Sequence, residues 1–311
     1  YYNNCKKGFF SKIYLYVLKY KYKKQQIKYG FSIPINTFGP GLYIQHRGTI
    51  CVNGSARIGS NCRINVDVNI GKTPILKDIS LQLEKGKITA LIGPNGCGKT
   101  TLLQTLNGVS TVVSGDIILD DEFYLKLPAR ERARRLSFMP QFRESAPCIS
   151  VKGLVEHGRF PYMGFARKMN KEDEEAIEQA LEFTGISKYG NCMVNELSGG
   201  LQQRAYLAMQ LAQKSPYMVM DEPMNYLDFP GQREMLGLIR KLRDNGYTVI
   251  LVLHDLNQAL QIADRLIVMK DRGIVDIGTP QECLQRGTIE KVFDCTVTTI
   301  ESGGIPYYMF I

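Results

Sequence analysis

Residues 88–106 read ITALIGPNGCGKTTLLQTL, and this stretch decides the fold. It begins with a short apolar run, continues as a glycine-rich loop of the pattern G-x-x-x-x-G-K-[ST] over 93–100, and ends in a helix-forming run. Glycines let the backbone of such a loop wrap its N–H groups around an anion, and the dipole of the following helix adds positive potential. The stretch therefore predicts a strand, a phosphate-binding loop and a helix.

Two side chains of this loop have a predicted chemical task. We expect Lys99 to reach the β- and γ-phosphates of a nucleotide and Thr100 to offer its hydroxyl to Mg²⁺. The nucleotide-binding residues predicted here are Gly93, Pro94, Asn95, Gly96, Cys97, Gly98, Lys99, Thr100 and Thr101. A chance glycine turn is the alternative interpretation, and the strand–loop–helix order around the loop argues against it.

Apolar runs and amphipathic stretches alternate along the rest of the chain. The β-like runs are ITALI (88–92), DIILD (116–120), YMVM (217–220), TVILVL (248–253) and RLIVM (265–269). Between them lie stretches with helical periodicity, such as EDEEAIEQALEF at 172–183. This alternation is typical of an α/β domain with a largely parallel sheet.

The run YMVM leads into two acidic residues, Asp221 and Glu222. A strand that ends beside a phosphate-binding loop presents such acids to the bound nucleotide. We expect Asp221 to join the Mg²⁺ shell and Glu222 to polarise the attacking water beside the γ-phosphate.

Residues 197–204, LSGGLQQR, open a helical run and resemble the LSGGQ signature of the ATP-binding-cassette (ABC) ATPases. Other motifs of that family follow in its order: Gln141 as the Q-loop, 225–228 (NYLD) as the D-loop and His254 as the switch histidine. The resemblance covers about residues 73–311. It implies a P-loop NTPase fold of the ABC ATPase type, with a helical subdomain at about 142–200.

The resemblance also implies roles for individual residues and a mode of assembly. Two copies would face each other head to tail, so that ATP lies between the phosphate-binding loop of one and the signature of the other. The resemblance implies that Glu222, His254 and Gln141 are catalytic residues and that ATP and Mg²⁺ are the cofactors. The implied Mg²⁺ ligands are Thr100, Gln141 and Asp221, and the further implied nucleotide contacts are Leu197, Ser198, Gly199, Gly200 and Asp228.

Three stretches are similar to the ATPase subunits of ferric-siderophore, haem and cobalamin importers. They are HGRFPY (157–162), the run at 251–259 and ADRLIVMKDRGIVDIGTP (263–280). This similarity implies permease subunits in trans and a peripheral place on the cytoplasmic face of a bacterial inner or cell membrane, with no nucleic acid as partner. Two alternatives remain open: a transport-independent ABC protein that acts on nucleic acid or ribosomes, and an O-acetyltransferase.

Three features depart from the family's pattern. Leu201 stands where the signature usually has Gln, and Met224 replaces a small hydroxyl residue. The window 69–74, where the family carries an aromatic residue that stacks on adenine, contains none. We therefore expect weaker nucleotide binding and a blurred choice of base, because stacking on an aromatic ring is worth ~1–3 kcal/mol.

The first quarter of the chain carries the positive charge. Residues 1–71 hold eleven Lys or Arg against one acid, Asp67, whereas the whole 311-residue chain has a formal net charge of +9. Residues 9–28 place apolar and lysine side chains at helical spacing, so 1–30 is predicted to be a basic amphipathic segment. A solvated basic face is the favoured interpretation, and a membrane-surface or nucleic-acid contact is the alternative.

Residues 31–71 follow a different sequence pattern, in which small apolar residues recur about every six positions. They resemble part of the left-handed β-helix of serine-acetyltransferase-like acyltransferases, and His46 lies where that family carries its catalytic base. About two coils cannot build an acyl-CoA groove, so we predict an inactive fragment. The six-residue repeat ends at residue 71, and 72–311 is the predicted ATP-binding domain. This abrupt change suggests that the chain is a fusion of two unrelated pieces.

The cysteines and the apolar runs exclude other classes. None of the eight cysteines forms a CxxC pair, which favours reduced thiols over a zinc or disulfide framework. The apolar run at 13–18 is far shorter than the ~20 residues of a membrane span, so we expect no direct span. The first methionine is Met139, so we expect the natural start to lie elsewhere.

Overall fold

The computed structural model describes residues 31–32, 43–44, 50–52, 63–64, 68–70, 76, 78–110, 112, 114–141, 146–164, 168–302 and 305–311. The chain divides into two compact units, Tyr1–Pro74 and Ile75–Ile311. The predicted basic helix at 1–30 and His46 lie outside the described residues. The boundary between the units is three residues from the predicted one at 71/72.

The first unit contains short parallel strands. They are β1 (Phe31–Ser32), β2 (Tyr43–Ile44), β3 (Ile50–Val52), β4 (Arg63–Ile64) and β5 (Val68–Ile70). Phe31 pairs with Ile50, and Ile50 pairs with Val68, so the strands of this sheet repeat after 18 or 19 residues. Three hexapeptides per coil produce such a repeat. The acyltransferase-like β-helix itself stays a prediction.

The second unit is built on a six-stranded sheet with the order β13-β12-β6-β11-β10-β9. All neighbouring strands are parallel except β12 and β13, which are antiparallel. The prediction of an α/β domain with a largely parallel sheet is therefore confirmed. In chain order the strands are β6 (Ile88–Ile92), β9 (Leu136–Met139), β10 (Tyr217–Asp221), β11 (Thr248–Val252), β12 (Arg265–Lys270) and β13 (Gly273–Gly278).

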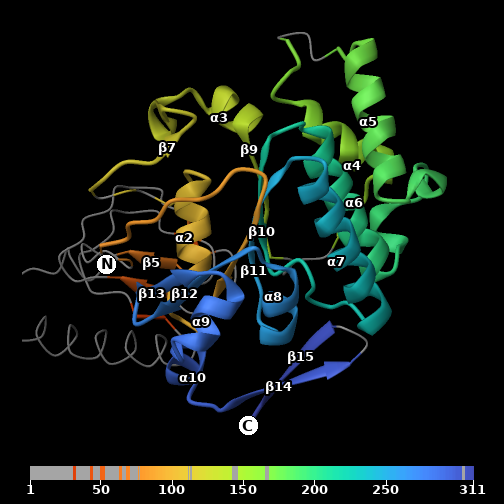
Figure 1. Cartoon of the computed structure of the whole chain (residues 1–311). Coiled ribbons are helices and arrows are strands. Elements are labelled where there is room, and N and C mark those ends of the chain that lie inside the picture. The colour runs from red at the N-terminus through yellow and green to blue at the C-terminus, as the bar shows by residue number, and fades with distance from the viewer. Residues whose placement is uncertain are drawn as a thin grey trace, which may run out of the picture. The chain divides into compact units, whose positions relative to one another are not determined.

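Helices cover both faces of this sheet, which is why its central strands are apolar throughout. Ile88 and Ile92 of β6 point into the larger core, whereas Leu91 points into the smaller one. Helix α2 packs on the smaller core, and α6 and α7 pack on the other face (Figure 1). The helices are α2 (Lys99–Leu106), α3 (Ala129–Arg135), α4 (Val151–Glu156), α5 (Lys171–Phe183), α6 (Gly199–Ala212), α7 (Phe229–Asp244), α8 (Leu256–Ile262), α9 (Pro280–Gln285) and α10 (Thr288–Phe293).

The run DIILD at 116–120 does not join the main sheet. It forms β7 (Ile118–Leu119), which pairs with β8 (Glu122–Phe123) in a separate antiparallel hairpin. Asp120 and Asp121, with φ of 51° and 64°, make the tight turn between them. Two consecutive residues with positive φ match the twist of a two-residue hairpin, so local turn chemistry decides this segment.

A buried ion pair holds the helical region together. Arg159, 1% exposed, donates through Nε to Asp173 Oδ1 at 2.8 Å and through a terminal nitrogen to the carbonyl of Ala212 at the end of α6, also at 2.8 Å. Burial acts to raise the pKa of Asp173, but the N–H of Asn170 and the guanidinium of Arg159 outweigh it, so the pKa is lowered. The pair thus ties the segment before α5 to both α5 and α6.

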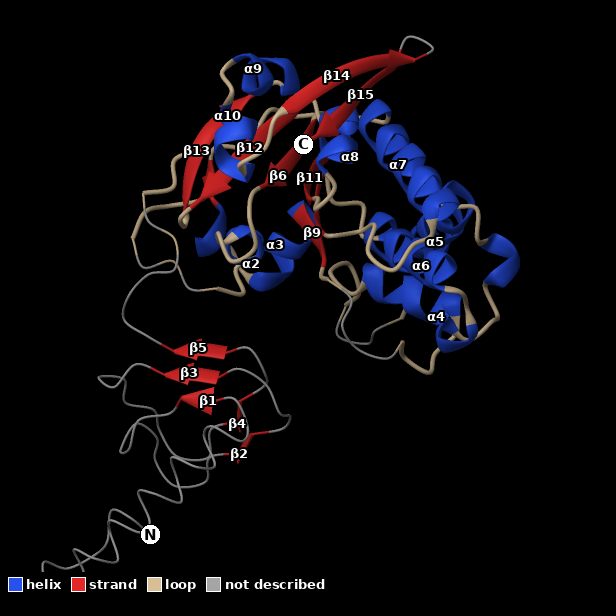
Figure 2. Cartoon of the chain, turned by 90° about the horizontal axis from the view of Figure 1, so that it is seen from below, coloured by secondary structure: helices blue, strands red, loops and turns tan. Residues whose placement is uncertain are grey.

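The chain ends in a β-hairpin, β14 (Val297–Ser302) and β15 (Ile305–Phe310). It lies beside α8 in both views (Figures 1 and 2), and the side-chain oxygen of Asn257 on α8 accepts a hydrogen bond from the N–H of Tyr308 at 2.8 Å. Across the described parts of the chain, no helix combines the length and the apolar character needed to span a membrane.

Candidate functional site

The glycine-rich loop follows β6 and leads directly into α2, as the sequence predicts. Gly93 has a φ of 154°, and a Cβ atom there would lie 2.2 Å from the carbonyl oxygen of Met269 on β12. Gly98 has a φ of 103°, and its Cβ would lie 2.5 Å from a methyl group of Leu76. The backbone carbonyl of Met269 leaves no room for a side chain at Gly93, and the positive φ disfavours one at Gly98.

The side chain of Lys99 folds back onto this loop. Its ammonium lies 2.6 Å from the carbonyl oxygen of Gly93 and 3.1 Å from that of Pro94, and the residue is only 6% exposed. Helix α2 begins here with no acidic residue in its first turn, so its N-terminus keeps its positive potential. The loop, the ammonium and the helix end therefore form a cradle that fits a phosphate group.

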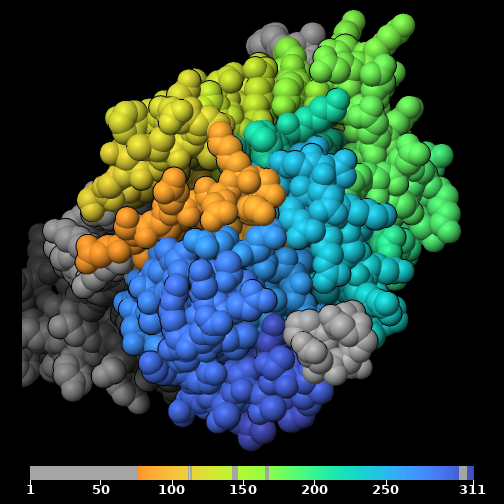
Figure 3. Space-filling model, in the orientation of Figure 1, coloured from red at the N-terminus to blue at the C-terminus, as the bar shows by residue number. Residues whose placement is uncertain are grey.

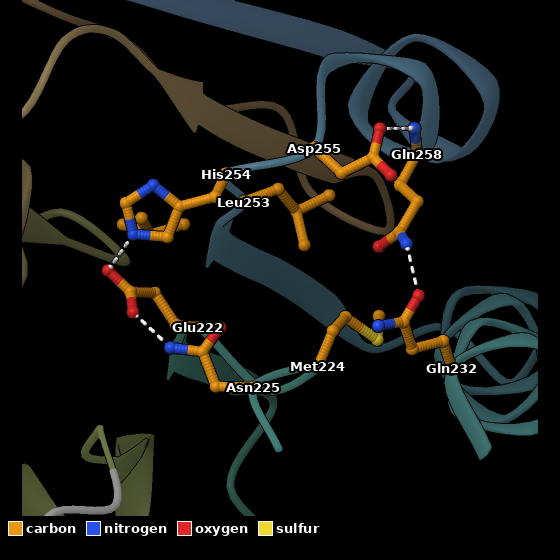
Figure 4. Close-up of a pocket in the computed structure, with 9 residues that line it drawn as sticks. Glu222, Met224, Asn225, Gln232, Leu253, His254, Asp255 and Gln258 are labelled. Carbon is orange, nitrogen blue, oxygen red and sulfur yellow. Dashed lines mark hydrogen bonds and ion pairs between the residues drawn. The ribbon is translucent and has the colours of Figure 1, made fainter. Parts of the chain in front are cut away.

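Glu222 is the centre of a cluster that contains all three predicted catalytic residues. It directly follows β10 with a φ of 54° and is 8% exposed. Its Oε2 accepts hydrogen bonds from the side-chain amides of Gln141 and Asn225. Its Oε1 lies 2.5 Å from Nε2 of His254, and Figure 4 shows the contacts with Asn225 and His254. Residues that are far apart in the sequence thus converge on one carboxylate.

Asn225, predicted only as part of the D-loop, is an additional partner of Glu222. The residue lies three positions after Glu222, in the turn that follows β10. The sequence gives only a weak indication of this contact, because the side chain of Asn225 can face the carboxylate of Glu222 only when the backbone between the two residues turns sharply. The positive φ of Glu222 provides that turn, and it is not visible in the sequence.

A cavity of about 160 Å³ lies beside this cluster. Its lining includes Glu222 and His254 on one side and Gln232 of α7 and Gln258 of α8 on the other (Figure 4). The amide nitrogen of Gln258 donates to the amide oxygen of Gln232 at 2.8 Å, so the two helices are linked at this wall. The polar lining allows water to reach the carboxylate and the imidazole.

The residues present fit a Mg²⁺ ion that shares its shell with a nucleotide. Asp221 ends β10 and is 2% exposed, and α2, whose second residue is Thr100, contacts β10. Among the described residues there is no group of three or more His, Cys, Asp or Glu that could hold a metal ion by itself. A carboxylate and a hydroxyl would therefore need phosphate oxygens and water to complete an octahedral shell.

The signature and the D-loop form a second cluster. Ser198 caps the start of α6, is exposed, and makes no capping hydrogen bond with its hydroxyl. A Cβ atom on Gly199 would lie 3.3 Å from the carbonyl oxygen of Tyr226, so the signature touches the D-loop. Asp228 accepts a hydrogen bond from the N–H of Gly231 at 3.0 Å and thereby caps α7. Leu197 and Gly200 flank the cap of α6.

The unusual residues of the site have a structural explanation where they are described. Met224 is 6% exposed and packs in the larger core, and Leu201 packs against that core. Apolar side chains therefore suit both positions. In the window 69–74, the backbone of 69–70 belongs to β5 and residues 71–74 lie outside the described part, so the expectation of weak adenine stacking stays a prediction.

Comparison with known proteins agrees with this geometry. The family model described as ABC transporter matches residues 76–225. The ferric enterobactin transport ATP-binding protein FepC of Escherichia coli (strain K12) is 39% identical over 239 residues, which cover 76% of this chain and 88% of that protein. The probable siderophore transport system ATP-binding protein YusV of Bacillus subtilis (strain 168) is 38% identical, with coverage of 78% and 89%.

Solved structures share the fold. An inward-facing metal-chelate type ABC transporter matches with a TM-score of 0.66 and 24% identity, over 76% of this chain and 90% of that chain. The dimeric bacterial cassette MJ0796 matches with a TM-score of 0.59 and 27% identity, over 66% of this chain and 90% of that chain. The chain belongs to the ABC transporter family, as an ATP-hydrolysing subunit.

Proposed function

We propose that this ATPase energises the import of an iron–siderophore, haem or cobalamin type metal chelate through a separate membrane permease. The convergence of Gln141, Asn225 and His254 on the Glu222 carboxylate carries the catalytic part of this proposal. The choice of cargo is supported by the relatives, two of which are named for ferric enterobactin and siderophore transport. Permease attachment would give the protein a peripheral place at the cytoplasmic face of the membrane.

Catalysis would proceed with the chain's own groups in distinct tasks. The loop N–H groups and the ammonium of Lys99 bind the β- and γ-phosphates, for which the ammonium leaves the carbonyls of Gly93 and Pro94. Glu222 orients a water molecule toward the γ-phosphate and takes its proton, while His254 holds the carboxylate in place. Thr100, Asp221 and Gln141 would hold Mg²⁺, which would neutralise phosphate charge when bound.

This sequence of events requires Gln141 to change partners. In the structure its amide donates to Glu222, so it occupies an oxygen that an attacking water would use. Moving Gln141 toward the metal would take away one of the two amide donors on that oxygen, with Asn225 as the other, and would displace the chain at residue 141. A link between nucleotide binding and movement of the helical region, and from there to the permease, would result.

The assay for the cargo uses vesicles that contain the permease, the ATPase and the external binding protein of one candidate importer. We expect ATP-dependent uptake of a metal chelate that is lost when the ATPase is omitted. Hydrolysis that is equally fast with and without the chelate-loaded permease, together with no uptake, would contradict the importer assignment while leaving the ATPase assignment intact.

The first mutational test concerns Lys99. Lys99→Ala is expected to weaken ATP binding by about 10- to 100-fold, because a hydrogen bond to a charged group is worth ~1.5–3 kcal/mol. Isothermal titration calorimetry measures the change. Lys87→Ala, at an exposed lysine just before β6, is the matched control and should bind ATP like the parent. If both variants bound ATP with equal affinity, Lys99 would not be part of the nucleotide-binding site.

A head-to-tail dimer is supported by the surface around the signature. Tyr226 and Phe229 are 77% and 79% exposed. They lie near the N-terminus of α6, where the hydroxyl of the N-cap residue Ser198 makes no capping hydrogen bond. Large aromatic side chains are rarely left in water without a partner, and the second copy would cover them. Each nucleotide would then contact the phosphate-binding loop of one copy and the signature of the other.

Ser198→Arg tests this arrangement. The bulky side chain would stand where the γ-phosphate of the partner's nucleotide approaches, so the ATP-dependent dimer should be lost while ATP still binds the monomer. Size-exclusion chromatography with ATP measures the dimer. Ser187→Arg, at an exposed serine of the same helical region, is the control. A Ser198→Arg protein that dimerises as well as this control would rule out the predicted contact.

A further inference from the structure

The two faces of the C-terminal hairpin differ in what they contact. Directly opposed residues of an antiparallel pair share a face, and the register pairs Val297 with Phe310 and Thr299 with Tyr308. Tyr308 is 7% exposed and packs in the larger core, together with Val297 and Phe310. This inner face attaches the hairpin to the rest of the ATPase domain.

The outer face is apolar and exposed. Its cross-strand pairs are Ile300 with Tyr307, Thr298 with Met309, and Thr296 with Ile311. We call these six residues the outer strip. Its four large apolar side chains, Ile300, Tyr307, Met309 and Ile311, are 46%, 48%, 47% and 77% exposed.

No residue of the outer strip is charged. Soluble proteins usually interrupt exposed sheet faces with charged side chains, because an apolar strand face associates with other surfaces. In the space-filling view the dark blue C-terminal residues lie at the bottom edge, open to solvent (Figure 3). An uncharged, flat apolar strip of this kind fits a partner surface that is itself uncharged and apolar.

The outer strip is connected to the surface that the second copy would cover. Phe229 and Gln232 lie in the first turn of α7, and the side chain of Gln232 is bonded to Gln258 of α8. The neighbouring residue, Asn257, accepts the hydrogen bond from the N–H of Tyr308 in β15. Two side-chain hydrogen bonds, each 2.8 Å long, therefore join the D-loop side of α7 to the hairpin.

We propose that the outer strip is a second contact between two copies of this chain, adjoining the ATP-dependent interface. The inference rests on the proposed head-to-tail dimer. In a two-fold dimer a surface that lies on the symmetry axis meets its own copy, and we place the outer strip there. An uncharged apolar strip is self-complementary at that axis, whereas a charged one would repel its copy.

The small size of the strip limits what this contact does. Stable protein interfaces bury ~1,200–2,000 Å² in total, and six side chains on each copy fall below that range. The strip alone therefore does not hold a dimer together. It adds to the stability of the dimer while ATP holds the two copies together.

The experiment measures the dimer constant in a background that accumulates the ATP-bound state. The parent is the full chain with Glu222→Gln, and the strip variants add Ile300→Lys or Met309→Lys. Val109→Lys and Val275→Lys are the matched controls, because these valines are 69% and 53% exposed outside the hairpin. Sedimentation equilibrium with ATP gives the dissociation constant of each dimer.

We expect each strip variant to weaken the dimer by roughly tenfold or more, since like charges would face each other, and the controls to stay within about twofold of the parent. Mixing Met309→Lys with Met309→Glu should restore association relative to either variant alone, which no folding defect would produce. Circular dichroism melting of each variant verifies the fold.

The outcomes separate this inference from the proposed function. If the parent stays monomeric with ATP, the proposed dimer is wrong. If the parent dimerises and the strip variants do so equally well as the controls, the outer strip is not a contact between copies. Unchanged dimerisation combined with lost co-purification of the permease would assign the strip to the permease and overturn the inference in the same way.

Discussion

Glu222→Gln is expected to slow ATP hydrolysis by about 10²–10⁴-fold, the usual contribution of a positioned general base. The substitution keeps the shape of the side chain but removes the carboxylate that takes the proton of the attacking water. Lys99 and the loop are untouched, so ATP should still bind. Because the ATP-bound state is the closed one, the variant should accumulate as a dimer with ATP in Mg²⁺-free buffer on size-exclusion chromatography.

The structure adds a detail to this expectation. Both oxygens of Glu222 accept hydrogen bonds or face a ring nitrogen, whereas a glutamine offers only one oxygen. The glutamine oxygen can still accept from Gln141 and Asn225, but the glutamine nitrogen can contact Nε2 of His254 only in the tautomer in which Nε2 carries no proton. Glu178→Gln, at an exposed position of α5, is the control and should hydrolyse ATP at the parental rate. Near-parental turnover by Glu222→Gln would place the base elsewhere.

The centre of the fold could be predicted from local sequence. Residues 88–106 carry a buried strand, a loop and a helix in an order whose glycines leave few other conformations, and β6 and α2 have the expected extents. The strand at 217–221 and the helix at 171–183 can be predicted equally well, because a short unbroken apolar run indicates a buried strand and the apolar residues of the helix follow the helical period.

The catalytic cluster could be predicted only through family resemblance. Gln141 and His254 are 81 and 32 residues away from Glu222, and no local pattern brings them together. The hydrogen bond from Asn225 to Glu222 could not be predicted, because it depends on the left-handed backbone conformation of Glu222. Asp228 was predicted as a nucleotide contact and caps α7 in the structure, so a role at the nucleotide of a second copy stays a proposal.

The C-terminal hairpin was missed for a different reason. The strands 297–302 and 305–310 alternate between an inner and an outer face, but Glu301 is their one charged residue, and the other side chains of both faces are apolar or carry hydroxyl groups. The period of two is therefore hidden in the sequence, since alternation is visible only when one face is polar. The same feature that concealed the strands leaves the outer strip exposed in the structure.

The second large effect is expected from the buried ion pair of the helical region. Arg159→Met should lower the free energy of unfolding by about 3–5 kcal/mol, because it leaves the carboxylate of Asp173 buried without its partner. Arg159 and Asp173 have side chains that are only 2% and 3% exposed, so water cannot replace the lost contact. Urea denaturation monitored by circular dichroism measures the change.

Two further variants separate the charge from the packing. Arg159→Met with Asp173→Leu should recover part of the loss, since no charge stays buried without a partner, although the carbonyl of Ala212 and the N–H of Asn170 still lose their side-chain contacts. Arg243→Met is the control, because Arg243 is 31% exposed and its nearer partner, Asp244, is 60% exposed, and exposed pairs contribute ~0–1 kcal/mol. Equal destabilisation by Arg159→Met and Arg243→Met would show that the buried pair does not hold the helices.

The pH dependence gives a second, independent readout of the same pair. In the parent the pKa of Asp173 is lowered, so the carboxylate stabilises the fold above its unfolded value of ~3.9, and this stabilisation is lost as the pH falls through the folded pKa. Without Arg159 only burial and the Asn170 N–H act on the carboxylate. Its pKa then rises, and the acid becomes neutral at a higher pH than in the parent. The stability difference between parent and Arg159→Met should therefore be largest near neutral pH and shrink on acidification, whereas a loss of packing alone would leave it constant.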